Sequence, residues 1–365
     1  MRRKALLRET FEKVSHLLAN HEPQPAEYLD VEQIILAKGS LITPERQAFA
    51  HRICGLFPRA RVREQPNTPG NMVAVSGRDV IGRREKGKRT LVLGELKSAV
   101  RCREGEPGIR EEYWFFSTHA NCHYGCRYCY VGAARTVWFS PAIRIHVNLE
   151  EIIQQIDEAA FAQGDVTGFY QGRLQDALAL DPLTGYSKVL VPFFSKHRFA
   201  RQILLTKSTS VDNLLHLNHG GKTILCWSLI PPDIAQLLEC DVPSVESRIH
   251  AMKRCAEKGY PVRARIQPVF PKKEWRRAYA EFVKYLVSEV RLDRLAFGGV
   301  YTNGRVRYLT KRLLPEYYGA FKGICKGNSD EEVYSRPWCE KYYGDSVYAA
   351  VSARPRIDIG PCHIL

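Results

Sequence analysis

The residues of this sequence that could carry chemistry are three closely spaced cysteines, Cys122, Cys126 and Cys129, in a C-x3-C-x2-C pattern. Thiolates at this spacing on one loop can hold three irons of a [4Fe–4S] cube. A cube needs a fourth ligand, and no fourth cysteine lies near the three in the sequence. The spacing therefore predicts a cluster with one open iron, to which a small molecule can bind.

Two other uses of these cysteines fit the sequence less well. A structural zinc site takes four protein ligands, usually as two spaced pairs, and the nearest fourth ligand, His123, is adjacent to Cys122. Disulfides are typical of secreted chains, whereas this chain has 11 cysteines, an odd number, and no long apolar segment near its N-terminus. Reduced cysteines and an oxygen-sensitive cluster predict a cytoplasmic protein.

The second informative feature is a net charge of +15, from 54 Lys and Arg against 39 Asp and Glu. Such a surplus favours a polyanionic partner, most often nucleic acid, although a basic surface without a specific partner is the alternative. The charge is clustered at 83–89, 272–277 and 305–312, and the last two clusters interleave aromatic side chains that could stack on bases. Arg305 and Arg307 are therefore expected to contact DNA. No apolar run reaches the roughly 18 residues that a membrane span needs.

The elements that must position these residues alternate as short apolar strands and helical patterns from about residue 111 to 300. Such alternation is typical of parallel βα units. Six units predict an α/β fold, a partial (β/α)6 barrel, with the cysteine loop after the first strand and the chemistry at the carboxyl ends of the strands. Strands are expected at 113–118, 167–171, 202–206, 223–229, 262–268 and 294–299, and helices at 149–163, 185–197, 211–216, 244–258 and 275–290.

The barrel is expected to be flanked by two further regions. Residues 1–105 form an N-terminal α+β extension with helices near 5–20 and 43–56 and a strand at 89–94. The barrel spans 106–310. The tail, 311–365, has no clear period and is expected to pack near the barrel mouth or the nucleic acid. Asn148 and Ser244 are typical helix starts.

Several segments of the chain resemble the spore photoproduct lyase family, a DNA-repair group of radical S-adenosylmethionine (AdoMet) enzymes. The resemblance runs in order from about residue 85 to 300, over 88–94, 122–130, 143–152, 175–185, 205–207, 211–215, 227–229 and 259–261. The founding activity of the family reverts 5-thyminyl-5,6-dihydrothymine in spore DNA to two thymines. In these enzymes AdoMet chelates the open iron, and an electron from the cluster cleaves it to a 5′-deoxyadenosyl radical.

The resemblance implies a role for individual residues. The three cysteines would hold the cluster. Residues at strand ends would contact AdoMet, and a pair of tyrosines around the third cysteine would take part in hydrogen transfer. From the residue types alone, a strand-end lysine can be solvated, and a serine or a tyrosine can belong to the core. The AdoMet contacts implied in this way are Asp176, Lys207 and Ser228, and the tyrosines are Tyr128 and Tyr130.

One position departs from the family pattern. The lyases that revert the spore lesion have a cysteine three residues before the aspartate that matches Asp176, and it returns a hydrogen atom to the thymine radical. This chain has Arg173 there, and arginine has no weak X–H bond to give. Cys226 is a candidate replacement, because it lies two residues before Ser228 on one expected strand and shares its face. The alternative for Cys226 is a small buried core residue.

The sequence therefore predicts a radical AdoMet enzyme that acts on a thymine-derived base in DNA, by lyase-like repair. Arg173 could instead anchor a carboxylate or phosphate, which would suit an isomerase or a modifying enzyme of hypermodified thymidine in phage-type DNA. A non-catalytic DNA-binding protein with an iron–sulfur cluster is the third possibility. The expected partners are DNA and a reductase, flavodoxin or ferredoxin as electron donor, and a monomer is favoured.

Overall fold

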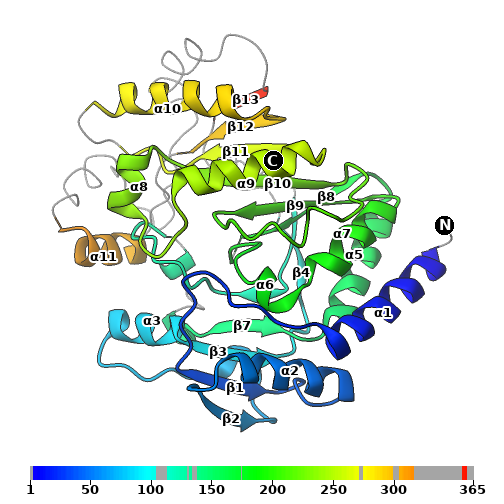
Figure 1. The fold of residues 1–365 in the computed structure, drawn as a ribbon. Coiled ribbons are helices and arrows are strands. Elements are labelled where there is room, and N and C mark those ends of the chain that lie inside the picture. Colours follow the sequence, from blue (N-terminus) through cyan, green and yellow to red (C-terminus); the bar gives the residue numbers. More distant parts are fainter. Residues whose placement is uncertain are drawn as a thin grey trace. The chain divides into compact units, whose positions relative to one another are not determined.

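The computed structural model describes residues 3–103, 113–129, 131–133, 138–173, 175–270, 274–298 and 304–315, and the backbone of 356–359. The chain divides into two compact units (Figure 1). Unit 1 comprises Met1–His123 and Arg135–Ile224, and unit 2 comprises Tyr124–Ala134 and Leu225–Leu365. The division falls inside the cysteine loop, so that Cys122 belongs to unit 1 while Cys126 and Cys129 belong to unit 2.

Unit 1 contains a five-stranded sheet in the order β2-β1-β3-β7-β6, in which only the short β6 is antiparallel. Two of its helices begin with side-chain caps: the Thr43 hydroxyl accepts from Arg46 N at the start of α2, and the Asp79 carboxylate accepts from Gly82 N at the start of α3. The elements are α1 (Arg3–Asn20), β1 (Gln33–Ala37), α2 (Pro44–Leu56), β2 (Arg61–Gln65), η1 (Gly70–Met72), α3 (Val80–Lys88), β3 (Thr90–Gly94), β6 (His119–Ala120) and β7 (Ile143–His146).

The second group of strands in unit 1 places β5, β8 and β9 side by side in parallel, with β4 antiparallel to β5. Helix α5 begins after Asn148 as expected, but the Asn148 side chain does not cap it. Its amide bonds instead to the backbone N and O of Leu96, which ties the end of β3 to α5. The elements are β4 (Val100–Arg103), β5 (Tyr113–Phe116), α5 (Leu149–Gln163), β8 (Thr167–Gln171), α6 (Asp181–Thr184), α7 (Ser187–Lys196) and β9 (Ala200–Thr206).

A large apolar core joins helices and strands of unit 1, and a smaller apolar cluster that includes Ile35 and Val92 lies apart from it. Helix α1 contributes one apolar face, with Leu6, Val14, Leu17 and Leu18 buried and Leu7 and Phe11 packed at its margin. Asp157 on α5 is fully buried within this helical layer, and its carboxylate accepts from Arg3 Nε at 2.6 Å and from His197 Nε2 at 3.2 Å. These bonds satisfy an otherwise costly buried charge.

Unit 2 carries the strands β10 (Thr223–Leu229, which starts at the division between the units), β11 (Val262–Ile266), β12 (Arg294–Phe297) and β13 (Arg356–Ile359), all parallel. Ser244 caps α9 by accepting from Ser247 N, as predicted. The helices are α8 (Pro232–Leu238), α9 (Val245–Glu257), α10 (Trp275–Glu289) and α11 (Gly304–Leu313), with a short η2 (Val131–Ala133) after the cysteine loop.

The six predicted strands are confirmed as β5 and β8 to β12, and four of the five predicted helices as α5, α7, α9 and α10. The prediction of a helix at 211–216 is wrong, because Leu214 N bonds to the Val211 carbonyl and Leu217 N to the Leu214 carbonyl in successive turns. Among the described residues no helix is long and apolar enough to cross a membrane. The α/β class and the strand–helix order of a partial (β/α)6 barrel are as expected.

Candidate active site

The cysteine loop is fixed to unit 2 by its backbone. Gly125 N donates to the Cys240 carbonyl at 2.7 Å, and Arg127 N donates to the Leu238 carbonyl at 2.9 Å. Only glycine fits at position 125, since a Cβ there would lie 2.6 Å from the Cys240 oxygen. Cys129 N bonds back to the Cys126 carbonyl at 3.4 Å, so that the two cysteines share one turn. The end of α8 and the loop after it therefore hold the Cys126–Cys129 turn in place through backbone hydrogen bonds.

A buried polar chain runs from the cysteine loop to the end of β10. The Tyr128 hydroxyl donates to Glu239 Oε1 in a short hydrogen bond, and Arg248 Nη2 donates to Glu239 Oε2 at 2.5 Å. Arg248 also donates to the Ser228 carbonyl at 3.2 Å and to the Pro243 carbonyl at 2.7 Å. Burial and the Glu239 carboxylate raise the pKa of Tyr128 well above its ordinary value, so its phenol keeps its proton.

On the unit 1 side of the loop, His123 is buried and its Nε2 lies 2.9 Å from the Glu27 carbonyl oxygen. This contact occupies one ring nitrogen of His123 and leaves Nδ1. The donor set that the cysteine spacing supplies is three thiols, none of which is part of a disulfide among the described residues. This set fits three irons of a cube. No group of three His, Cys, Asp or Glu side chains in the described ranges forms a preformed metal site.

Asp176, in the loop after β8, accepts four hydrogen bonds. Its Oδ1 accepts from Leu178 N at 3.0 Å, Ala179 N at 2.9 Å and Thr206 Oγ1 at 2.6 Å, and its Oδ2 accepts from Lys207 N at 2.6 Å. The carboxylate thus joins its own loop to the end of β9. Asp176 and Lys207 are brought together at neighbouring strand ends, and the carboxylate fixes the backbone of Lys207.

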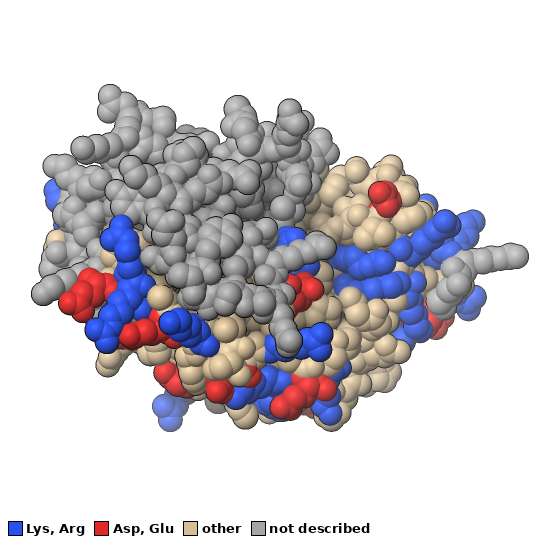
Figure 2. All heavy atoms as spheres, turned by 90° about the horizontal axis from the view of Figure 1, so that it is seen from above, with Lys and Arg blue, Asp and Glu red and all other residues tan. Residues whose placement is uncertain are grey.

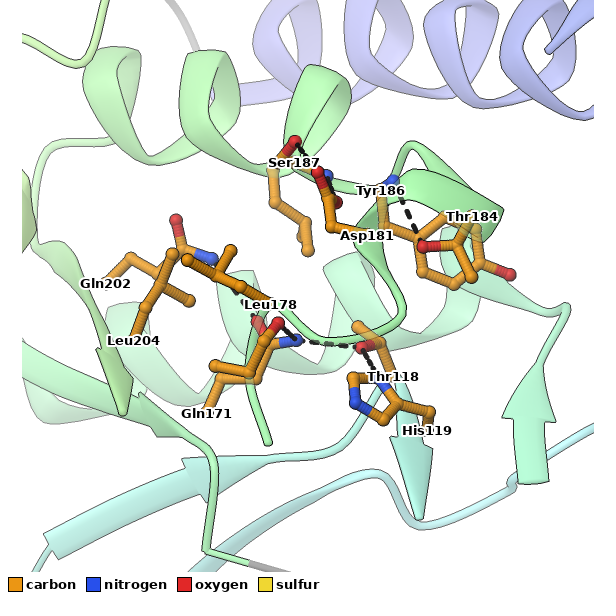
Figure 3. Close-up of a pocket in the computed structure, with 12 residues that line it drawn as sticks. Thr118, His119, Gln171, Leu178, Asp181, Thr184, Tyr186, Ser187, Gln202 and Leu204 are labelled. Atoms are coloured by element: carbon orange, nitrogen blue, oxygen red, sulfur yellow. Dashed lines mark hydrogen bonds between the residues drawn. The ribbon is translucent and has the colours of Figure 1, made fainter. Parts of the chain in front are cut away.

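A second chain of polar side chains makes a hydrogen bond to the Asp176 loop and borders a small cavity of about 10 Å³ (Figure 3). Gln171 Nε2 donates to Thr118 Oγ1 at 2.9 Å, Thr118 Oγ1 lies 3.1 Å from His119 Nδ1, and His119 Nε2 lies 2.7 Å from the Asp176 carbonyl oxygen. These contacts suit a neutral imidazole that donates through Nε2. Burial lowers the pKa of His119 to about 4.

Arg173 occupies a defined place after β8. Its guanidinium carbon lies 4.4 Å from the centre of the Phe115 ring on β5, a cation–π contact. Gly172 makes the turn possible, because its φ of +115° favours glycine and a Cβ there would collide with the Leu205 carbonyl. Arg173 and Asp176 thus lie on one loop of unit 1.

The remaining predicted residues lie in unit 2 or outside the described part. Cys226 and Ser228 lie on β10, and Ser228 Oγ bonds to the Gln267 carbonyl at 3.3 Å. Burial raises the pKa of Cys226, so its thiol stays protonated. Arg305 and Arg307 lie on α11, which packs against η2 directly after the cysteine loop. Tyr130 lies outside the described residues.

Sequence reasoning missed the residues that hold the site together, namely His119, Gln171, Glu239 and Arg248. Three carry no motif that distinguishes them from surface residues. The one available signal was Glu239, a charged residue between Leu238 and Cys240. Its role follows only from the hydrogen bond that it accepts from Tyr128 in the folded chain.

The comparisons with known proteins show the family of the chain. A family model described as spore photoproduct lyase matches residues 47–338. The chain belongs to the spore photoproduct lyase family. Among its relatives is a spore photoproduct lyase of Geobacillus sp., 26% identical over 306 residues that cover 82% of this chain and 85% of that protein. Another, of Bacillus subtilis, is 27% identical over 240 residues, 65% of this chain and 68% of that protein.

Solved structures of spore photoproduct lyases share the fold. One complexed with dinucleoside spore photoproduct has a TM-score of 0.74 and 19% identity, over 91% of this chain and 99% of that chain. A doubly substituted lyase with bound AdoMet and dinucleoside spore photoproduct has a TM-score of 0.75 and 20% identity, again over 91% and 99%. These matches confirm the radical AdoMet type of partial barrel.

The docking of the cysteine loop can be tested at Gly125. Gly125→Ala should push the loop away from Cys240 and lower the iron retained per chain at least about twofold, since all three thiolates are needed for the cube. Iron and sulfide analysis with the brown absorbance of the cluster would measure this, and far-ultraviolet circular dichroism would show the fold intact. Gly55→Ala is the matched control, because a Cβ at Gly55 meets nothing within 4 Å. Equal iron in both variants would contradict the docking.

The buried His119 predicts a sensitivity to acid. Its folded pKa of about 4 lies below the ordinary 6.5, so the unfolded chain binds the proton first as pH falls. The free energy of unfolding should therefore be highest above pH 6.5 and fall by roughly 3 kcal/mol between pH 6.5 and 4. Urea unfolding across this range should give a shallower decline for His119→Gln, while the exposed His16→Gln control keeps the full slope. Identical slopes for all three proteins would refute this.

Proposed function

We propose that this chain is a radical AdoMet enzyme that acts on a thymine-derived base in DNA, as spore photoproduct lyases do. The observation that carries the proposal is the cysteine loop, which backbone hydrogen bonds hold in a fixed turn within a chain that belongs to this family. Related lyases bind AdoMet and dinucleoside spore photoproduct in solved structures, which supports the same cofactor and substrate class here.

The residues of the chain would divide the work between binding and positioning. When bound, the cluster and AdoMet supply a 5′-deoxyadenosyl radical that abstracts a hydrogen atom from the substrate. Cys122, Cys126 and Cys129 would hold the cluster. Asp176 accepts hydrogen bonds from the β9 end and so would orient Lys207 toward AdoMet as a positioning residue. Ser228 would contact AdoMet from the end of β10.

Tyr128 and Cys226 are the proposed hydrogen donors in the described part of the chain, and Tyr130 is the third. Tyr128 would give its phenolic hydrogen atom to the thymine radical, so that the O–H bond breaks, a C–H bond forms and a phenoxyl radical remains. In the structure its hydroxyl donates to Glu239, which holds the side chain in place. Glu239 is itself held by Arg248, which also donates to the Ser228 carbonyl. This chain would couple the tyrosine to the strand end that is proposed to contact AdoMet.

The DNA-binding part of the proposal rests on the distribution of charge. Helix α11 carries Arg305 and Arg307 and packs against η2, directly after Cys129 in unit 2. Figure 2 shows Lys and Arg side chains in several groups over the face in view, with Asp and Glu side chains beside some of them. Phosphates on such a surface would be bound in a salt-dependent way.

A reductase, flavodoxin or ferredoxin would supply the electron, and we propose a monomeric, cytoplasmic protein.

A second candidate function is favoured by Arg173. This guanidinium is held against Phe115 where a lyase has its hydrogen-donating cysteine. It could bind a carboxylate or phosphate on a hypermodified thymidine in phage-type DNA, in which case the enzyme would be an isomerase or modifying enzyme. A non-catalytic DNA-binding protein is the third candidate, and AdoMet cleavage separates it from the other two.

The function is tested with the reconstituted, reduced protein under anaerobic conditions. We expect about four irons per chain, conversion of AdoMet to 5′-deoxyadenosine, and a changed thymine nucleoside when DNA carrying the spore lesion or modified thymidines is added. Mass spectrometry of the nucleosides identifies the substrate. Affinity for DNA should fall with salt, and less steeply after Arg305→Ala and Arg307→Ala. A colourless protein with one tight zinc, or a reduced cluster that leaves AdoMet intact, would overturn the proposal.

The residue at position 173 should decide between lyase and isomerase. Arg173→Cys should raise turnover of the spore lesion about tenfold or more, because a thiol gives a hydrogen atom to a carbon radical, and 5′-deoxyadenosine should form in both proteins. Arg173→Ala is the control that removes the cation without adding a donor. If the natural protein already repairs the lesion quickly, Cys226→Ala should abolish repair. If Arg173→Cys gains nothing while Arg173→Ala loses a carboxylate-bearing thymidine, the isomerase is the better description.

A further inference from the structure

Three arginines share one face of the unit 2 strands with Ser228 (Figure 1 shows β10, β11 and β12 adjacent). In the register of these parallel strands Cys226 pairs with Arg263 and Arg263 with Arg294, while Ser228 pairs with Arg265. Paired residues, and residues two apart on a strand, project to the same side. The opposite side is apolar, with Trp227, Ala264, Leu295 and their neighbours buried. The Ser228 face therefore concentrates positive charge.

The three arginines differ in their partners. Arg263 Nε donates to Asp293 at 2.7 Å, near the start of β12. Arg294 adds its charge at the same level of the sheet, and the charges of all three act on the buried Cys226 thiol. Arg265 is only 8% exposed, yet it makes no hydrogen bond or ion pair with any residue in the described part of the chain. Buried Arg248, by contrast, donates to Glu239 and to two carbonyls.

The side chain is thus nine-tenths buried, while its guanidinium keeps some contact with solvent and has no acceptor in the described part of the chain. Such a partly dehydrated cation gains from an anion that binds to it. Such a group persists where a ligand completes it. Arg265 is the last residue but one of β11, beside Ser228 at the same level of β10, and the carboxyl ends of parallel strands are where α/β folds bind their ligands. The planar fork of an arginine matches the two oxygens of a phosphate or carboxylate.

We propose that Arg265 binds a phosphate of the nucleotide substrate, on a strand face made basic by Arg263 and Arg294. This rests on the proposed function, because it assigns the anion to the substrate of the same site. AdoMet also carries a carboxylate, but in this family that carboxylate is expected at the open iron, which leaves the phosphate as the anion in need of a partner. Arg265 is thus a specificity residue for nucleotides over nucleosides.

The proposal is tested with the cluster-loaded protein, Arg265→Gln, Arg265→Lys and a control, Arg277→Gln, which removes the same charge from an exposed position on α10. Binding of thymidine 5′-monophosphate and of thymidine is measured by calorimetry, so the readout does not require turnover. The natural protein should prefer the monophosphate about tenfold or more. Arg265→Gln should lose this preference, Arg265→Lys should keep part of it, and the control should keep all of it.

Two further measurements separate the possible outcomes. Arg265→Met should not lower the melting temperature, since the guanidinium has no partner to lose in the described part of the chain, whereas removal of a structural arginine would lower it. AdoMet affinity should be unchanged in Arg265→Gln, and a selective loss of AdoMet binding would overturn the proposal by assigning Arg265 to the AdoMet carboxylate. An unaltered preference for the monophosphate would also overturn it. If the preference depends on Arg265 but spore lesions are not repaired, this inference stands and the lyase proposal fails.

Discussion

The buried pair of Glu239 and Arg248 is the interaction on which the site in unit 2 depends. Both side chains are about 1% exposed, and their 2.5 Å contact is completed by the Tyr128 hydroxyl on one side and by the Pro243 and Ser228 carbonyls on the other. A buried ion pair contributes little net stability when complete, but loss of one partner costs roughly 3–5 kcal/mol. The pair therefore sets the position of the cysteine turn and of the β10 end together.

In unit 1, Asp176 is the buried group that positions the site residues, as the Glu239–Arg248 pair does in unit 2. Its carboxylate accepts only from backbone N–H groups and the Thr206 hydroxyl, and its carbonyl accepts from neutral His119. Both oxygens of the carboxylate therefore have hydrogen-bond partners. The consequence is that the loop carrying Arg173 has little freedom, so that a change at residue 173 alters the chemistry offered to the substrate more than the shape of the loop.

The sequence predicted those features that depend on neighbouring residues. The cysteine spacing, the strand–helix alternation and the helix start at Ser244 are local patterns of this kind and were predicted. The cap at Thr43 is also local but was not predicted. Strands β1, β2 and β7 were not predicted: they have five or fewer residues, and β2, of sequence RVREQ, is mostly polar and exposed. The helix expected at 211–216 failed because its bonds close turns and do not propagate.

The residues that position the site could not be predicted, because their partners lie far along the chain. Tyr128 and Glu239 are 111 residues apart, and Thr206 and Asp176 are 30 apart. A glutamate or a histidine in the sequence carries no sign of whether it will be buried, and only the fold decides whether its charge is compensated.

Arginine at position 173 and at position 265 raises one question about substrate. The reversal of a thymine lesion is a reaction between neutral bases and needs a hydrogen donor, whereas a guanidinium is permanently charged and gives no hydrogen atom. Arg173 lies against the Phe115 ring, which stabilises its charge. Arg265 has no such ring or carboxylate in the described part of the chain. Of the two, Arg265 is therefore the residue for which we propose an anionic ligand, and Arg173 stands where the family resemblance implies a hydrogen-donating cysteine.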